Sequence, residues 1–184
     1  MKIFVLILIA LVSTYATAKV EDPVSNAALF VDGFLRGALA KEIGRVDDCL
    51  TDGDKIINDV DTLLKDCEGK FDLLDIITDI GSLLVDIPKS IKDCENLPDT
   101  VEDTFKRWEK TIKDPIKIAK IVYKALSDYK DQLKDDAQTF VSEWKADHYE
   151  NSGEKLGDIP HILFDECSNE DAPFKAVKTL IEQE

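Results

Sequence analysis

The chain has 184 residues and a formal net charge of −15, with 38 Asp and Glu against 23 Lys and Arg. This acidic balance argues against nucleic-acid binding, because phosphates need Lys and Arg to neutralise them, and against electrostatic docking on anionic lipid. It favours solubility or the binding of cations, and the length suits one domain around one core.

The first eighteen residues have the pattern of a secretory signal peptide. Lys2 supplies the positive charge, residues 3–12 are apolar, and Ala16-Thr17-Ala18 fits the cleavage rule of signal peptidase. The apolar run is shorter than the about 20 residues that a membrane-spanning helix needs, so a retained anchor is the minor alternative. We expect residues 1–18 to be removed, residues 19–184 to form a single helical domain, and the protein to be secreted or held in the lumen of the secretory pathway. No later segment predicts a transmembrane span.

Apolar residues recur every three or four positions along most of the remaining chain, which predicts amphipathic α-helices. In order, the expected helices cover residues 24–50, 54–67, 71–94, 101–112, 116–151, 156–167 and 173–182. No sustained alternation with a period of two and no Asn-Gly hairpin turn is present, so strands are not expected. The predicted fold is all-α, a disulfide-stabilised bundle of about five to seven amphipathic helices.

Three of these helices carry features with a structural meaning. In the first, Gly33 and Gly37 lie four residues apart, a spacing that lets another helix approach closely; a ligand role is the less favoured interpretation. The helix over residues 71–94 is the most apolar and is expected at the centre, with a kink at Pro88. If the bundle contains a cavity, we expect it beside that kink. No Pro or Gly interrupts residues 116–151, which predicts one helix about 45 Å long.

The four cysteines share one local setting. Each follows an acidic residue and has a large apolar residue three positions before it, which places the sulfur on the core side near the end of a helix. Carboxylates and the negative end of a helix dipole raise the pKa of a thiol, so a reactive nucleophile is not expected. The four residues are Cys49, Cys67, Cys94 and Cys167.

An even number of cysteines behind a signal peptide predicts two structural disulfides. Four cysteines allow three connectivities. Helices that alternate up and down favour Cys49–Cys94, which leaves Cys67–Cys167. Zinc is the competing interpretation, but no C-x-x-C occurs and only His148 and His161 could assist.

No motif for catalysis or cofactor binding is present. Neither histidine lies in a metal-ligand spacing, and the chain has no G-x-S-x-G elbow and no glycine-rich phosphate loop. We therefore expect no enzyme, no catalytic residue, no cofactor and no dedicated metal site. The nearest calcium candidate, residues 47–54, lacks the alternating oxygen ligands and terminal Glu of an EF-hand, which leaves diffuse calcium binding by surface carboxylates.

The chain loosely resembles small secreted all-helical cysteine-containing proteins predicted in ciliates. The residues that carry this resemblance are Phe30-x-x-Gly33-Phe34-x-x-Gly37, the cysteines at helix ends, and Ile87-Pro88-x-x-Ile91-x-x-Cys94. It is similar to saposins to a lesser degree, since those are shorter and have six cysteines. The resemblance implies a secreted helical protein and brings no assigned activity.

Two functions from different classes fit these observations. The first is a secreted helical binding or interaction protein that carries an apolar ligand. The second is an acidic structural or storage protein that assembles with calcium. The candidate partners are accordingly an apolar molecule or diffuse calcium, and nucleic acid is not expected.

Overall fold

A computed structural model describes residues 23–69, 71–95, 97, 98 and 100–168 of the chain. The expected signal peptide and the expected helix over residues 173–182 lie outside this part. Within it the fold is all-α, as predicted, and no strand is present. The elements are α2 (Pro23–Leu39), α3 (Gly53–Glu68), α4 (Leu73–Ser90), α5 (Thr100–Ile112), α6 (Pro115–Asp128), α7 (Lys130–Lys145), α8 (Tyr149–His161) and the π-helical turn η1 (Ile162–Glu166).

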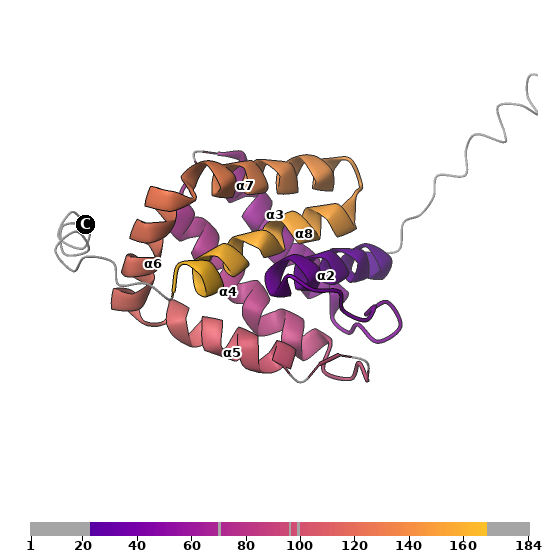
Figure 1. Cartoon of the computed structure of the whole chain (residues 1–184). Coiled ribbons are helices and arrows are strands. Elements are labelled where there is room, and N and C mark those ends of the chain that lie inside the picture. The colour runs from indigo at the N-terminus through magenta and orange to yellow at the C-terminus, as the bar shows by residue number, and fades with distance from the viewer. Residues whose placement is uncertain (1–22, 70, 96, 99, 169–184) are drawn as a thin grey trace, which may run out of the picture.

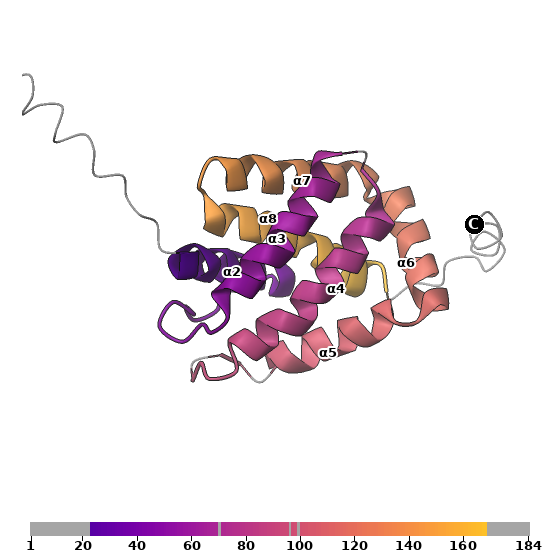
Figure 2. The same ribbon diagram turned by 180° about the vertical axis from the view of Figure 1, so that it is seen from behind.

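The helices form two packed layers with three helices around their edges. Helices α2 and α8 lie side by side on the face seen in Figure 1, and α3 and α4 form the opposite face, seen in Figure 2. Helix α7 covers one edge and contacts both α8 and α3, while α5 covers the opposite edge and packs on α4. The most extensive helix–helix contact joins α2 to α8. The most extensive contact is therefore made by this pair and not by the helix over residues 71–94.

A series of aromatic contacts runs through the core between the layers. Phe30 and Phe34 of α2 are fully buried, and Phe34 meets Phe105 of α5 edge-on at 6.1 Å between ring centroids. Phe105 stacks on Trp108 at 5.5 Å, and Phe30 meets the part-buried Trp144 of α7 at 5.6 Å. Aromatic pairs of this kind stabilise by about 0.5–1.5 kcal/mol beyond the area that they bury. They connect α5, α2 and α7 through one cluster of buried side chains.

The contact between α2 and α8 is built from glycines on both helices. A Cβ added to Gly33 would lie 1.9 Å from the carbonyl oxygen of Glu150, and one added to Gly153 would lie 2.0 Å from that of Phe30. Gly37 and Gly157 repeat the arrangement one turn further along. The close approach predicted at Gly33 and Gly37 is confirmed, and its partner is a second pair of glycines four residues apart.

Ion pairs flank this glycine contact. Arg36 of α2 bridges two carboxylates of α8, with Nη1 2.8 Å from Glu150 Oε1 and Nη2 2.9 Å from Glu154 Oε2. Hydrogen bonding to Glu150 is the main reason that the pKa of Arg36 is raised. Because the two carboxylates are one turn apart on α8, the guanidinium fork fixes the register of the two helices.

Two helices end earlier than their apolar periodicity predicts. The first was expected to reach Leu50 but ends at Leu39, because Ala40 adopts a left-handed conformation (φ 49°). The chain then folds back, and the Asp32 carboxylate accepts a hydrogen bond of 2.9 Å from the backbone N–H of Val46. Val46 is buried as expected, but it lies in a loop and not in a helix.

The prediction of one long helix over residues 116–151 is wrong. The chain breaks at Tyr129 (φ −127°) and again at Asp147 (φ 61°), which separates α6, α7 and the start of α8. Asn151-Ser152-Gly153, expected to close the long helix, lies inside α8. The physical reason is packing: the breaks let α7 and α8 lie against each other, where the buried Ser152 hydroxyl donates to the Phe140 carbonyl at 2.9 Å.

Helix α4 keeps most of the expected apolar face. Asp72 caps it by accepting from the Leu74 N–H at 3.0 Å. The three- and four-residue spacing of apolar side chains also places Leu74 on this face, but Leu74 is 44% exposed and does not belong to the core. The helix passes through Pro88 and ends at Ser90, four residues before Cys94. Pro88 therefore lies in the last turn of α4. Its missing N–H donor removes one helical hydrogen bond there, and only two residues of the helix follow.

Candidate functional site: a groove between α4 and α5

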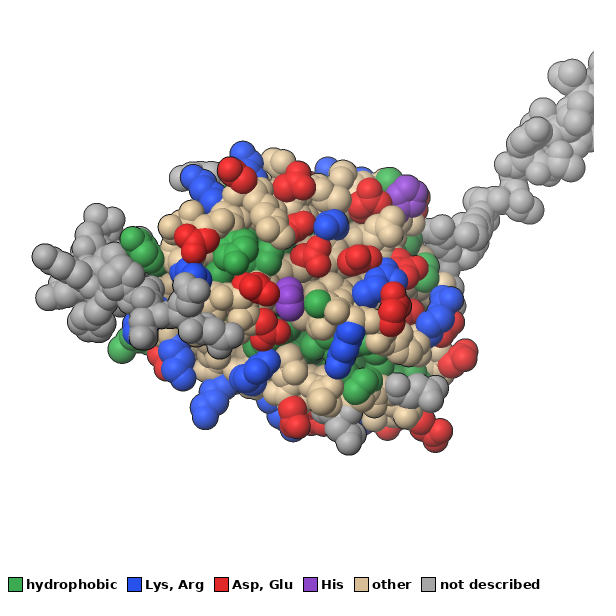
Figure 3. All heavy atoms as spheres, in the orientation of Figure 1, with side chains coloured by type: hydrophobic (Ala, Val, Ile, Leu, Met, Phe, Trp, Pro, Cys, Tyr) green, Lys and Arg blue, Asp and Glu red, His purple; other side chains and the backbone are tan. Residues whose placement is uncertain are grey.

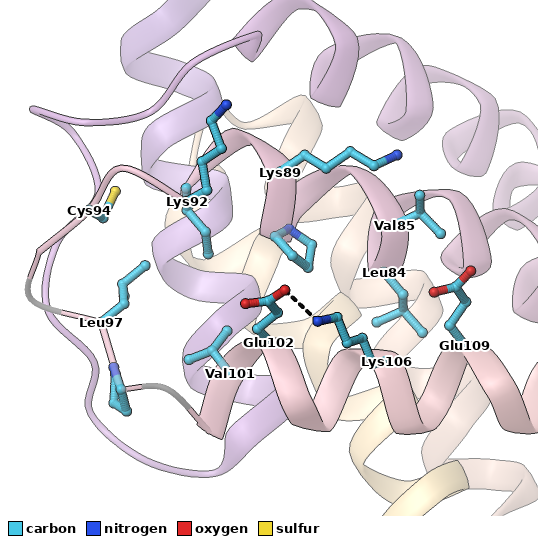
Figure 4. Close-up of a pocket in the computed structure, with 13 residues that line it drawn as sticks. Leu84, Val85, Lys89, Lys92, Cys94, Leu97, Val101, Glu102, Lys106 and Glu109 are labelled. Atoms are coloured by element: carbon cyan, nitrogen blue, oxygen red, sulfur yellow. Dashed lines mark ion pairs between the residues drawn. The ribbon is translucent and has the colours of Figure 1, made fainter.

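A groove of about 610 Å³ lies between the C-terminal half of α4 and the N-terminal half of α5 (Figure 4). It lies beside Pro88, which is where the sequence predicts a cavity if the bundle contains one. The loop between the two helices closes one end. Its lining consists of Leu84, Val85, Pro88, Lys89, Ile91, Lys92, Cys94, Leu97, Pro98, Val101, Glu102, Lys106 and Glu109.

The floor of the groove is apolar. Leu84, Ile91 and Val101 are buried at its base, and Val85 and Leu97 are part-buried along its sides. The two helices are consecutive and pack on each other directly. Pro88 adds an apolar ring to the lining, and α4 ends two residues later, at Ser90. An apolar molecule lying here would contact both helices.

The end wall of the groove is tied to the rest of the fold by a disulfide. Cys49, in the loop after α2, is bonded to Cys94, with a Cα–Cα distance of 5.3 Å. Beside it the backbone N–H of Thr51 donates to the Ser90 carbonyl at 2.8 Å, and the Thr51 hydroxyl donates to the same oxygen at 3.1 Å. The segment after α4 is not helical, and the disulfide and these two hydrogen bonds fix its position.

Charged side chains form the rim. Lys106 Nζ lies 2.6 Å from Glu102 Oε1 on the α5 side, as Figure 4 shows. On the α4 side, Lys89 and Lys55 share the Asp86 carboxylate at 3.3 and 2.7 Å. Burial alone would raise the pKa of Asp86, but hydrogen bonds from the two lysines hold it below its ordinary value.

The groove differs from the face shown in Figure 3 in how its apolar side chains are grouped. On the face shown in Figure 3, acidic and basic side chains alternate with small separate hydrophobic areas. In the groove, apolar side chains of α4, α5 and the loop between them lie together with three lysines and two glutamates. That arrangement is typical of sites for small molecules, which combine an apolar lining with a few placed polar groups.

The second disulfide expected from the sequence, Cys67–Cys167, is not formed, and this prediction is corrected. Cys67 ends α3, which packs on α4 and α7, whereas Cys167 follows η1, which packs on α8 and α6. The assumption that the C-terminal segment returns to the end of α3 is therefore wrong. Burial, with Asp66 and Asp79 nearby, raises the pKa of the Cys67 thiol to about 12. The direction of this shift is the one that the acidic setting of the cysteines predicts.

Carboxyl groups meet across the contact between α3 and α4. Asp66 lies against Asp79, and Asp59 lies against Asp86 about two turns away. Burial, followed by hydrogen bonding to Asp66, raises the pKa of Asp79 to about 6. Neither pair belongs to a larger group, since the described residues contain no set of three or more His, Cys, Asp or Glu side chains arranged to hold a metal ion.

The histidines lie apart from the groove. His148 is exposed near the start of α8, with Nδ1 3.0 Å from Glu143 Oε2. His161 ends α8 with Nδ1 3.5 Å from Asp165 Oδ2.

Sequence reasoning found only part of this site. Pro88 pointed to the α4 side, but nothing in the apolar periodicity identified Val101, Glu102 and Lys106 as the facing wall. The available signal was the break at residues 96–99, which makes α4 and α5 consecutive neighbours. The second glycine pair, Gly153 and Gly157, was also missed, although it has the same spacing as the first.

The comparisons with known proteins give one match. A family model described as SctB-like, Secreted protein B-like, matches residues 12–165, so the chain belongs to this family of secreted proteins. No curated protein and no solved structure matches the chain. Among the described helices, none is long and apolar enough to cross a bilayer. The resemblance to ciliate proteins stays a prediction.

Proposed function

We propose that this SctB-like protein is exported and acts as a binding protein that holds an apolar ligand in the groove between α4 and α5. The observation that carries the proposal is the apolar floor of the groove, about 610 Å³ in volume, in an otherwise charged molecule. Sites for small molecules range from about 300 to 1,000 Å³. A groove of this size and lining suits a ligand with one extended apolar part.

The way in which the groove is built supports binding over catalysis. Its titratable side chains are lysines and glutamates, and both glutamates have an ammonium partner: Glu102 pairs with Lys106, and Glu109 pairs with Lys113. A general acid or base needs a pKa near the working pH and a proton to exchange with substrate. Glutamates neutralised by lysines are better suited to shaping a rim, and the disulfide at Cys94 supports a preformed wall.

A charge placed in the apolar side of the groove tests the proposal. Val85→Asp removes apolar area and puts a carboxylate where an apolar ligand would have to desolvate it. We expect it to weaken binding of the uncharged fluorescent probe Nile red at least fivefold. Leu74→Asp is the matched control, because Leu74 is on the same helix, is 44% exposed and lies outside the groove. If the wild type does not bind the probe, or if both variants bind it equally well, the groove is not the site.

A second candidate is the acidic structural or storage protein that assembles with calcium. The carboxyl pair Asp66–Asp79 favours it, because divalent cations relieve repulsion between neighbouring carboxylates. Native mass spectrometry of protein purified from its own source separates the two. A co-purifying apolar molecule supports the binding protein, whereas calcium-dependent assembly without such a molecule supports the alternative.

A further inference from the structure

We propose that the ligand of the α4–α5 groove is an amphiphile with a single anionic head group, such as a fatty acid, whose head lies at the α4 edge beside Lys92. This inference rests on the proposed function and specifies the class of ligand. Its basis is the charge of the groove lining, which has the opposite sign to the charge of the chain as a whole.

The lining contains more cations than anions. Lys89, Lys92 and Lys106 line the groove together with Glu102 and Glu109, whereas the whole chain has a net charge of −15. Both glutamates are neutralised by ammonium groups, since Lys106 lies 2.6 Å from Glu102 and Lys113 contacts Glu109. The rim therefore presents no uncompensated carboxylate to a ligand.

The positive charge that remains is on the α4 side. Asp86 is shared between Lys89 at 3.3 Å and Lys55 at 2.7 Å, so one carboxylate faces two ammonium groups. Lys92 follows one turn after Lys89, is exposed, and has no ion-pair partner among the residues that the structure describes. Figure 4 shows Lys89 and Lys92 along the α4 edge of the groove, with their ammonium groups on the side away from α5. An anion bound there would gain a partner without breaking an existing ion pair.

The floor and the edge together define an amphiphile. Leu84, Pro88, Val101 and Leu97 offer a surface to a hydrocarbon chain, and the lysines offer a partner to one anionic group at its end. The negative charge of the rest of the molecule does not prevent this, because charges more than about 8 Å away are largely screened at physiological ionic strength. A cationic amphiphile would instead meet the lysines and be rejected.

The test compares three ligands with the same chain and different heads: dodecanoate, dodecanol and dodecylammonium, each below its aggregation concentration. Their dissociation constants are measured by calorimetry on the full chain with its disulfide intact. We expect dodecanoate to bind several-fold tighter than dodecanol and dodecylammonium to bind weakest, with the preference for the acid shrinking in 0.5 M salt. Each methylene removed from the chain should weaken binding roughly fourfold.

Lys92→Met tests the position of the head. The substitution keeps the length and apolar stem of the side chain and removes its charge, so dodecanoate should bind roughly two- to fivefold more weakly while dodecanol binding stays unchanged. Lys134→Met on α7 is the matched control, since Lys134 is also exposed and lies outside the groove, and it should change neither value.

Two outcomes would overturn the inference, and they differ from failure of the proposed function. Equal affinity for dodecanol and dodecanoate, or tighter binding of dodecylammonium, would leave an apolar site and remove the anionic head. An unchanged dodecanoate affinity in Lys92→Met would remove the assigned position. If none of the three ligands binds, both the proposed function and the inference are wrong.

Discussion

Replacing Gly33 by alanine should separate α2 from α8. The added Cβ would lie 1.9 Å from the Glu150 carbonyl oxygen, whereas ordinary contacts begin at 3.4 Å, so the helices would have to move apart by about 1.5 Å. Overpacking costs about 1–3 kcal/mol and more when backbone must move. The gain in helix propensity from Gly to Ala returns about 1 kcal/mol. Because the added Cβ meets backbone, we take a gross cost of about 3–4 kcal/mol, which leaves a net loss of about 2–3 kcal/mol.

Gly81→Ala is the matched control and should have the opposite sign. Gly81 also lies within a helix, α4, but its added Cβ would first meet Ile112 Cδ1 at 3.7 Å, an ordinary contact. Only the propensity gain remains, so this variant should be more stable than the wild type by up to about 1 kcal/mol.

The two glycine variants are compared by urea and thermal unfolding of the oxidised protein. For a chain of this size, 1 kcal/mol corresponds to a shift in Tm of about 2–4 °C, so Gly33→Ala should lower Tm by about 4–12 °C. Gly81→Ala should raise it slightly. If Gly33→Ala were as stable as Gly81→Ala, the close approach of α2 and α8 at Gly33 would be refuted.

Two further predictions concern the carboxyl pair and the disulfide. The raised pKa of Asp79, about 6 against 3.8, means that its contribution to stability is present below pH 3.8 and is lost as the pH rises through 6. The full shift is worth about 3 kcal/mol, which solvent screening of this partly exposed pair with Asp66 reduces to about 1 kcal/mol. Asp79→Asn should therefore be about 1 kcal/mol more stable than the wild type in urea at pH 7.5 and no more stable at pH 3.5; a loss of stability at pH 7.5 would contradict the paired arrangement. The Cys49–Cys94 bond closes a loop of 45 residues, so replacing both cysteines by serine should cost about 4 kcal/mol. Reducing agent should then leave the unfolding curve of the double variant unchanged, and a similar stability of variant and oxidised wild type would show that the bond does not constrain the unfolded chain.

The disulfide also links stability to the groove. Cys94 lies in the segment between α4 and α5 that forms the end wall, and this segment has no helix to support it. Loss of the bond is expected to loosen the wall, so the Cys49→Ser and Cys94→Ser variant should bind Nile red more weakly than the wild type. The end wall of the groove thus depends on the disulfide, whereas its floor depends on the packing of α4 against α5.

The sequence predicted the α4 side of the groove because this side depends on a local feature, Pro88. Proline at position 88 must disturb the turn in which it lies, and this requirement is visible without any tertiary information. The opposite wall depends on how α5 is placed against α4. Val101 and Lys106 are ordinary members of an amphipathic helix, and only the packing of that helix makes them part of a groove.

The sequence by itself determined the helical class, most helix starts and the close-packing role of Gly33 and Gly37, because each follows from local periodicity, capping or side-chain size. Tertiary structure decided where the helices end and what they meet. Nothing local marks the breaks at Ala40, Tyr129 and Asp147, where no proline or glycine is present. Those breaks persist because the folded chain gains the contact of α8 with both α2 and α7, and continued helices would forfeit it.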